Sequence, residues 1–395
     1  MSDRVVICEA VRTPIGRFQG GLSSLKASKL GAVAIRAVLD RSGLDPSLVD
    51  EVIMGNVVQA GLGQNPARQA AIWGGVPTNV SAMTLNKVCG SGLRTVMAAA
   101  QAIKAGDIRC AIAGGMENMS QIPYALFDAR DGMRLGHRQV TDLMIHDGLW
   151  DVYNDFHMGM TAELVVEKYG VSRERQDAFA AESHARAAAA MAAGKFAREI
   201  VPVEVPQRKG DPVIVDTDEG PRADTTAAGL GKLKPAFKRD GGSVTPGNAS
   251  TINDGAAAVL VCAESFALEH GLKVRAVIEA YGTGPTDPEW VMMAPVGAVT
   301  NVAEKLGVKV TDFEVVELNE AFASQAVAVT EQLGLDPAKV NVHGGAVALG
   351  HPIGASGTRC LVTLLHAMED RDAKLGLVSL CLGGGDAVAM AVRRP

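Results

Sequence analysis

The run LNKVCGSGL, residues 85–93, introduces a helical pattern that continues to about Lys104. A strand-like apolar run, 108–113, follows this helix and ends in two glycines. The same order returns near the C-terminus, where Ser356–Met368 is a predicted helix and Gly376–Cys381 a predicted strand that ends in three glycines. Both helices open on Ser-Gly-X-Arg, so the two segments indicate a duplicated unit.

Apolar strands and amphipathic helices alternate around these two segments. In the N-terminal part, strands are predicted at 5–8 and 51–55, and a helix at Leu25–Ser42 that Gly43 ends. In the C-terminal third, strands are predicted at 274–280 and 313–318 and helices at 296–306 and 321–333. This βαβα order favours mostly parallel sheets with helices on their faces.

The stretch from about Ser120 to Asn248 interrupts the alternation with prolines and charged residues. Within it, the Ala-rich segment Arg173–Ala197 is a predicted helix with Ser172 as its N-cap and Gly194 near its end. A buried strand is predicted again at 254–262. We therefore expect an N-terminal core half at 1–120 plus 249–272, an inserted loop subdomain at 121–248, and a C-terminal core half at 273–395.

Composition limits the classes of function. The chain has 395 residues, of which 47% are hydrophobic, and a formal charge of −6. Two or three domains are expected from this length. There is no long basic block for nucleic acid and no apolar run of the roughly 20 residues that cross a bilayer. The first residues lack the features of a secretory or transit peptide, so we expect a cytoplasmic protein.

Six cysteines occur without CxxC spacing, and only Cys89 and Cys381 lie beside glycine clusters. The other four are expected to be buried apolar side chains. Cys89 precedes a helix, whose N-terminal amides and dipole favour the reactive thiolate. A buried structural thiol beside a glycine turn is the alternative. Cys381 ends a strand before three glycines, whose amides suit an oxyanion hole, or it is a buried cysteine before a tight turn.

Two further positions suit catalysis. His351, between Gly350 and Pro352, could deprotonate Cys89 or donate to a developing oxyanion. Its alternative is a loop histidine bonded to the backbone, and His343 and His157 also lie near glycines. Asn319 and Glu320 lie between a predicted strand and helix, where Asn319 could orient a water and Glu320 a histidine. Helix capping is the alternative for both.

The whole chain resembles the thiolase family, and in particular its acetyl-CoA acetyltransferase branch. The four runs that carry the resemblance occur in the family's order: Val88–Gly92, Asn319–Phe322, Gly350–Gly354 and Cys381–Gly385. A further run, Gln59–Arg68, resembles the short-chain, biosynthetic members. The resemblance implies a five-layered α-β-α-β-α fold from two duplicated βαβαβαββ halves with an inserted loop subdomain. It also implies at least a homodimer, and in the short-chain branch a homotetramer.

The resemblance further implies an acetyl-CoA C-acetyltransferase, which joins two acetyl-CoA into acetoacetyl-CoA and CoA through an acetyl-cysteine. Cys89 would be the nucleophile and His351 its activator, Cys381 would shuttle the proton of the second acetyl-CoA, and Asn319 would hold a water. The amides of Cys89 and Gly383 would bind the acyl oxyanion. Coenzyme A thioesters are substrates, and neither a metal nor a tightly bound cofactor is implied. Residues matching the family's CoA contacts are His157, Met158, Arg222 and Ser250, although Arg222 is otherwise an exposed charge and Ser250 a turn residue.

The chain departs from the family's pattern at three places. His343 replaces a frequent asparagine and is expected to add an imidazole near the site. Asp386 follows the glycine triplet where many relatives are uncharged, and 289–295 replaces a glycine-containing segment beside the acyl pocket. Met292 or Met293 would reshape that pocket, unless they are core packing. A longer-chain 3-ketoacyl-CoA thiolase therefore stays open as an alternative. A non-catalytic acyl-CoA-binding relative is disfavoured by the intact Cys89, His351 and Cys381, and a decarboxylating ketosynthase by the cysteine at 381.

Overall fold

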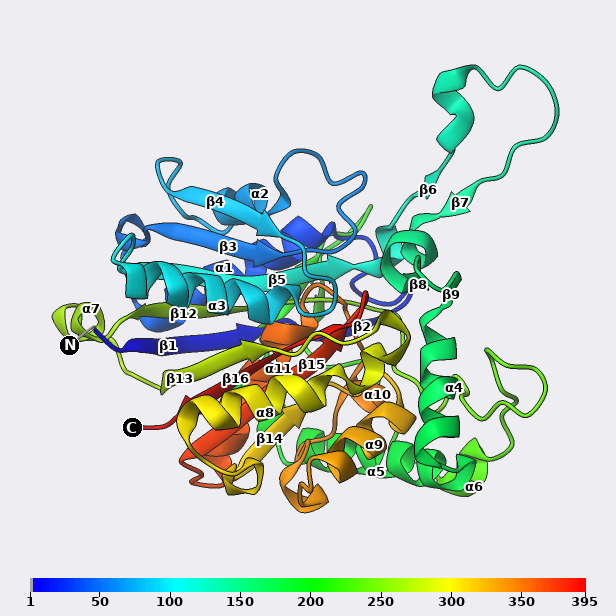
Figure 1. The fold of residues 1–395 in the computed structure, drawn as a ribbon. Helices are drawn as coiled ribbons and strands as arrows, with labels where there is room; N and C mark the ends of the chain where they lie inside the picture. Colours follow the sequence, from blue (N-terminus) through cyan, green and yellow to red (C-terminus); the bar gives the residue numbers. More distant parts are fainter. Residues whose placement is uncertain (1–2) are drawn as a thin grey trace.

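The computed structural model describes residues 3–395. Two halves of similar construction meet at the centre of the molecule (Figure 1). The elements of the first half are β1 (Val5–Arg12), β2 (Gly16–Arg17), α1 (Ala27–Ser42), β3 (Glu51–Gly55), α2 (Pro66–Trp73), β4 (Ser81–Leu85), α3 (Ser91–Ala105), β5 (Cys110–Asn118), β12 (Asn253–Ala263) and α7 (Glu264–Glu269). Those of the second half are β13 (Ala276–Thr283), α8 (Ala294–Leu306), β14 (Val315–Leu318), α9 (Ala323–Gln332), α10 (Ala346–Leu349), α11 (Ser356–Asp370), β15 (Leu375–Leu382) and β16 (Asp386–Arg393).

The strand order of the sheet displays the duplication. The first half runs β1-β12-β5-β3-β4, and the second repeats the first four positions as β13-β16-β15-β14. Two residue pairs between β1 and β13, Val6 with Val277 and Ile7 with Ala276, join the halves into one hydrogen-bonded sheet. The predicted duplication is therefore confirmed, and β4 has no counterpart in the second half.

The prediction of mostly parallel sheets is wrong for the centre of the sheet. Among the strand pairs of the described residues, only β3–β4, β3–β5 and β14–β15 are parallel, whereas β1, β12, β13 and β16 pair antiparallel with their neighbours. The reason lies in the connections. Strand β16, which was not predicted, follows β15 through a hairpin at the glycine triplet, and β12 returns from the insertion against β1 and β5.

Helices form the other layers of the fold. Helices α1 and α2 cover the outer face of the first half, α8 covers that of the second, and α3 packs against α11 between the two half-sheets. The glycines of the Ser-Gly-X-Arg motifs serve this central contact. A Cβ on Gly92 would lie 2.9 Å from the Thr358 backbone nitrogen, and one on Gly357 would lie 2.4 Å from that of Leu93. Only glycine permits this close approach of the two helix N-termini.

The segment between the core strands β5 and β12 holds most of the loop structure. Its elements are β6 (Tyr124–Ala125), β7 (Thr141–Asp142), β8 (Trp150–Asp151), β9 (Phe156–His157), α4 (Met158–Tyr169), α5 (Arg173–Ala192), β10 (Val203–Val205), β11 (Val213–Val215) and α6 (Ala227–Leu230). The Ser172 side chain caps α5 as predicted, but α5 ends five residues earlier than the predicted Ala197. Figure 1 shows the β6–β7 arm standing away from the body of the molecule.

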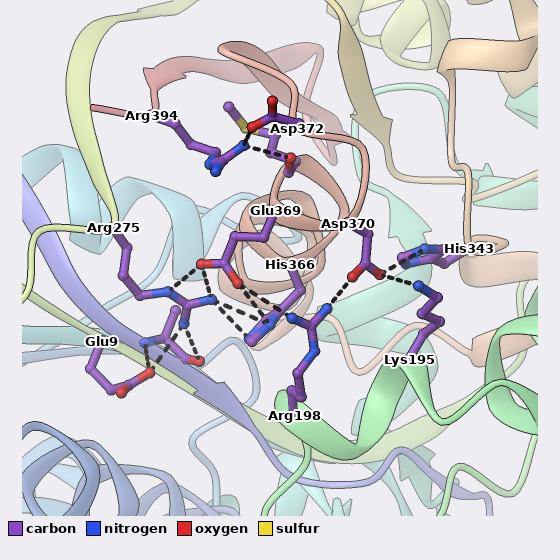
Figure 2. A network of polar contacts seen from close by, with 12 residues as sticks. Glu9, Lys195, Arg198, Arg275, His343, His366, Glu369, Asp370, Asp372 and Arg394 are labelled. Atoms are coloured by element: carbon purple, nitrogen blue, oxygen red, sulfur yellow. Dashed lines mark hydrogen bonds and ion pairs between the residues drawn. The ribbon is translucent and has the colours of Figure 1, made fainter.

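A polar network joins the end of α11 to the insertion and to β1 (Figure 2). Arg275 forms ion pairs with Glu9 at 3.1 Å and with Glu369 at 2.9 Å. Asp370 forms ion pairs with Arg198, Lys195 and His343. His343 therefore lies in a structural ion-pair network. The prediction that this substitution brings an extra imidazole to the site is wrong, because the ring faces Asp370 and Phe196.

Candidate active site

A mostly apolar cavity of about 530 Å³ opens where the two halves and the insertion meet. Cys89, His351, Cys381 and Gly383 all line it. Cys89 comes from the loop between β4 and α3, His351 from the loop before α11, Cys381 from the end of β15, and Gly383 from the turn between β15 and β16. The tertiary structure thus brings together four sequence-predicted residues that lie nearly 300 positions apart in the chain.

The loop that carries Cys89 is held by its own side chains. Asn86 Oδ1 accepts the Val88 amide at 2.9 Å, and Ser91 Oγ accepts the Lys87 amide at 2.8 Å and donates to the Val88 carbonyl at 2.6 Å. Val88 adopts a φ of 46°, which is strained for a β-branched residue. Such strain persists only where surrounding contacts fix it, so the loop presents Cys89 in one orientation.

The Cys89 side chain lies in the cavity wall and is partly accessible. Burial raises the pKa of its thiol to about 12, and the amides of Gly383 and Cys89, which donate toward the sulfur, oppose this only in part. Burial therefore opposes the thiolate that the sequence predicts at this helix N-terminus. Cys89 rests as a thiol, and a thiol becomes a nucleophile only when a base removes its proton.

His351 has the protonation state of such a base. Ser356 Oγ donates to the Pro352 carbonyl at 2.9 Å, so His351 Nδ1, 2.6 Å from the same Oγ, carries the proton and donates. This leaves Nε2 as the basic atom. Burial, with a contribution from Arg359, lowers the pKa of His351 to about 3, and the ring is neutral at physiological pH.

Cys381 ends β15 beside the second half's own glycine turn. Gly384 and Gly385 have φ values of 89° and 85°, which let the chain reverse into β16. Burial raises the pKa of Cys381 above the ordinary value, and the proximity of Cys89 raises it further. Its sulfur lies 4.0 Å from that of Met292, which also lines the cavity, whereas the buried Met293 does not.

Asn319 directly follows β14 and is fully buried behind His351. Its Nδ2 lies 3.5 Å from His351 Nε2, and its Oδ1 accepts from Arg359 at 3.4 Å. Contrary to the prediction, the Glu320 side chain forms no hydrogen bond with a histidine among residues 3–395. Its carboxylate accepts the Ser183 hydroxyl, the Asn341 amide and the Val347 backbone N–H, so it fixes neighbouring segments rather than a histidine.

The residues predicted to contact CoA divide into two groups. His157, Met158 and Ser250 line the cavity, and the His157 ring stacks on Phe237 at 4.8 Å. Arg222 does not line the cavity, and its backbone N–H donates to His184 Nδ1. In the same insertion, Lys238 forms an ion pair with Glu167.

The sequence reasoning missed several residues that shape the site. Phe237 and Phe322 line the cavity, and Arg17 and Phe18 reach it from the N-terminal segment. Glu117 accepts the amides of Val57, Val58 and Gly354, so it fastens the His351 loop to the first half. Nothing in the sequence around Glu117, which lies in a strand of mostly small residues, indicates that its carboxylate binds the His351 loop. The Ser356 hydroxyl could have been found, because it lies five residues after His351 at a helix start.

Two searches concern other kinds of site. Across positions 3–395 there is no group of three or more His, Cys, Asp or Glu side chains arranged to hold a metal ion. No helix in that range has the length and apolar character required to span a bilayer.

Comparison with known proteins places this geometry in a family. The model of the thiolase N-terminal domain matches residues 5–265, and that of the thiolase C-terminal domain matches residues 272–394. The chain belongs to the thiolase family. The boundary between the two family domains falls between β12 and β13, where the duplicated second half begins.

Individual thiolases match over the full chain. An acetyl-CoA acetyltransferase of Pseudomonas aeruginosa is 56% identical and one of Cupriavidus necator 55%, with 99% of each chain covered. A probable acetyl-CoA acyltransferase of Staphylococcus aureus is 52% identical over 99% of each chain. The crystal structure of the Bacillus anthracis acetyl-CoA acetyltransferase superimposes with a TM-score of 0.97 at 41% identity, covering 100% of this chain and 99% of that one. The predicted thiolase fold is thereby confirmed.

Proposed function

We propose that this thiolase is an acetyl-CoA C-acetyltransferase, which condenses two acetyl-CoA into acetoacetyl-CoA and CoA and also runs in reverse. The observation that carries the proposal is the presence of two thiols and one neutral imidazole on the wall of a single cavity. An acyl-transfer reaction that forms a carbon–carbon bond requires a nucleophile for the acyl group and a separate base for the second substrate. Relatives named acetyl-CoA acetyltransferase, at about 55% identity, support the same reaction.

In the first half-reaction, Cys89 attacks the thioester carbonyl of acetyl-CoA. Because its resting thiol is protonated, His351 Nε2 accepts the proton as the sulfur–carbon bond forms, and the proton passes to the departing CoA sulfur. The amides of Cys89 and Gly383, which already point at the Cys89 sulfur, suit the oxyanion of the tetrahedral intermediate. The products are acetyl-Cys89 and free CoA.

In the second half-reaction, Cys381 gives its thiol proton to His351 Nε2 and, as a thiolate, removes a proton from the methyl group of another acetyl-CoA. The resulting carbon attacks the acetyl group on Cys89, acetoacetyl-CoA forms, and Cys89 leaves as a thiolate that recovers the proton from His351. While it carries this proton, His351 Nε2 would stabilise the enolate oxygen of the second thioester together with Asn319 and the water that Asn319 would hold.

The shape of the cavity favours short acyl groups. Met292 occupies the space next to Cys381, where a longer acyl chain on the thioester would extend. The longer-chain 3-ketoacyl-CoA thiolase is therefore the less favoured alternative. The pantetheine arm would pass His157, Met158 and Ser250, and Arg222, outside the cavity, would contact the nucleotide end. No metal or tightly bound cofactor takes part in this scheme.

The assembly belongs to the proposal as well. The β6–β7 arm exposes Tyr124, Phe127 and Leu135 by 65, 60 and 88%, and the edge strand β4 exposes Met83 by 42%. Such apolar surface on a projecting arm and an unpaired edge is typically covered by another subunit. We propose a homodimer or homotetramer in the cytoplasm, with a core half at 1–120 plus 249–272, a CoA-binding insertion at 121–248 and a second core half at 273–395.

The most direct test is mass spectrometry after brief exposure of the protein to acetoacetyl-CoA or acetyl-CoA. The expected result is one acetyl group on Cys89, and its loss when free CoA is added. An acetyl group on another residue, or no adduct while thiolysis proceeds, would contradict the assignment of Cys89 as nucleophile.

A further inference from the structure

A buried acid–base pair lies behind the candidate site. The side chains of Glu317 on β14 and Arg359 on α11 are 1% and 2% exposed, and Glu317 Oε2 lies 3.7 Å from Arg359 Nη1. Within residues 3–395, neither Glu317 oxygen nor Arg359 Nε or Nη1 has a hydrogen-bond partner. Such a pair is a poor stabiliser, because burial raises the pKa of the Glu317 carboxyl to about 8 although Arg359 lowers it.

The duplicated half shows that the fold does not require this pair. The sheet ladders place Met54 opposite Gly114 in the first half and Leu318 opposite Ser379 in the second. Ile53 therefore occupies the position in β3 that Glu317 occupies in β14, and Ile53 is 1% exposed. Arg94, the fourth residue of α3 as Arg359 is of α11, is half-buried and donates to Gln101 instead.

The Glu317–Arg359 pair is linked to the candidate catalytic residues through one side chain, that of Asn319. Arg359 Nη2 donates to Asn319 Oδ1 at 3.4 Å, which turns the amide nitrogen of Asn319 toward His351 Nε2, 3.5 Å away. The first half has Gly55 at the position equivalent to Asn319, directly at the end of the strand. The charge pair and the amide that it contacts are thus both present only in the half that supplies His351 and Cys381.

We propose that Arg359, held by Glu317, is a positioning residue: it fixes Asn319 with its N–H group toward His351 and the oxygen of the second thioester. This inference rests on the proposed function. Without a donor at Arg359, the Asn319 oxygen keeps only the weak Cys360 thiol donor at 3.8 Å, so the amide can turn its oxygen toward the developing enolate, where it repels the charge. The positive charge of Arg359 also adds to the burial that keeps His351 neutral, so its loss has two separate consequences for catalysis.

The decisive experiment replaces both residues by apolar ones: Glu317→Ile, which copies Ile53 of the first half, together with Arg359→Leu. Removal of the whole pair leaves no unpaired ion, so we expect a thermal midpoint at or above that of the parent protein. We expect kcat for condensation to fall about 10- to 100-fold with little change in KM, since a misplaced group costs about this much. Acetylation of Cys89 falls less, because Asn319 acts on the second substrate.

Two companion variants separate positioning from folding. Arg359→Lys keeps the positive charge, but an ammonium group lacks the planar guanidinium that reaches both Glu317 and Asn319. We therefore expect a loss of kcat between those of the parent and the double variant. In variants that lack the positive charge, the acid limb of Cys89 acetylation moves to higher pH, because the pKa of His351 rises. Arg94→Leu in the first half is the matched control, with unchanged kcat and pH profile.

The outcomes distinguish the two proposals. A stable double variant with the parent's condensation kcat and pH profile would overturn the positioning role and leave the pair as packing. The same conclusion follows if Arg359→Lys is fully active. If the parent protein itself forms no acetyl-Cys89 and makes no acetoacetyl-CoA, the proposed function fails, whatever the variants do.

Discussion

The two halves of the molecule share a strand order but divide the chemistry. The first half supplies Cys89, two residues before α3, whereas the corresponding position before α11 is Gly354. The second half supplies Cys381 on β15 where the register of the first half places Met116 on β5. The comparison teaches that the duplicated sheet and central helices are the common scaffold, and that the halves differ by single residues at strand ends and helix starts. In the proposed function, these residues would make one half the acyl acceptor and the other the source of base and proton donor.

The largest expected effect comes from removing the first half's contribution. Cys89→Ala should abolish both half-reactions, with turnover falling at least about 10⁴-fold, since no other residue takes the acyl group. Loss of one sulfur from a partly accessible position should leave the thermal midpoint nearly unchanged. Substantial residual turnover, measured by thiolysis of acetoacetyl-CoA, would mean that the nucleophile lies elsewhere.

Removing the second half's thiol should break only one step. In Cys381→Ser, condensation should fall about 10²- to 10⁴-fold, because a hydroxyl is a far weaker acid than a thiol and does not ionise to the basic form near neutral pH. Rapid-quench mass spectrometry should still detect acetyl-Cys89 at a rate close to that of the parent. Equal slowing of acetylation and condensation would count against the division of labour between the halves.

A smaller effect is expected at the edge of the acyl cavity. Met292→Gly should open the space beside Cys381 and shift the ratio of kcat/KM for 3-ketohexanoyl-CoA over acetoacetyl-CoA by about tenfold toward the longer substrate. Met293→Ala is the control, because Met293 is buried but does not line the cavity. An unchanged ratio in the Met292 variant would assign that residue to packing alone.

Lowering the pH should reduce the stability of the second half before that of the first. Burial lowers the pKa of His351 to about 3 and that of His366 to about 2, while the unfolded chain binds these protons near pH 6.5. The associated stability is complete above pH 6.5 and declines as pH falls toward the folded values, by about 1.4 kcal/mol per histidine for each pH unit. Hydrogen exchange at pH 5 should show earlier opening of α11 than of α1, and His366→Asn should flatten the pH dependence of the melting temperature. Uniform opening would contradict this.

The smallest expected effect on stability concerns an ion pair that links the two halves. Lys87, in the Cys89 loop, pairs at 2.5 Å with Asp386 at the start of β16, and both side chains are partly exposed. Asp386→Asn should lower the free energy of unfolding by less than about 1 kcal/mol, as for other accessible ion pairs. A loss well above this, in a denaturant titration at low and high salt, would show that the pair does more than join two loops.

Much of this architecture was predictable, and the failures have physical causes. The helices beginning at Ser91 and Ser356 and the strand 51–55 follow from local periodicity and glycine stops, and the structure has them at those positions. The strand 386–393 was missed because a glycine triplet indicates the end of a strand as readily as a hairpin. The sequence also could not show that Arg222 lies outside the cavity or that His343 faces Asp370, because both positions depend on how segments far apart in the chain pack together.

The sequence by itself determined the family, the duplicated order of elements and the candidate catalytic side chains, because motifs and periodicity are properties of neighbouring residues. Only the tertiary structure decided the protonation of Cys89 and His351, since a pKa depends on burial and on charges from other segments. It also revealed the Glu317–Arg359 pair behind Asn319, because residues 42 positions apart meet only when β14 packs on α11.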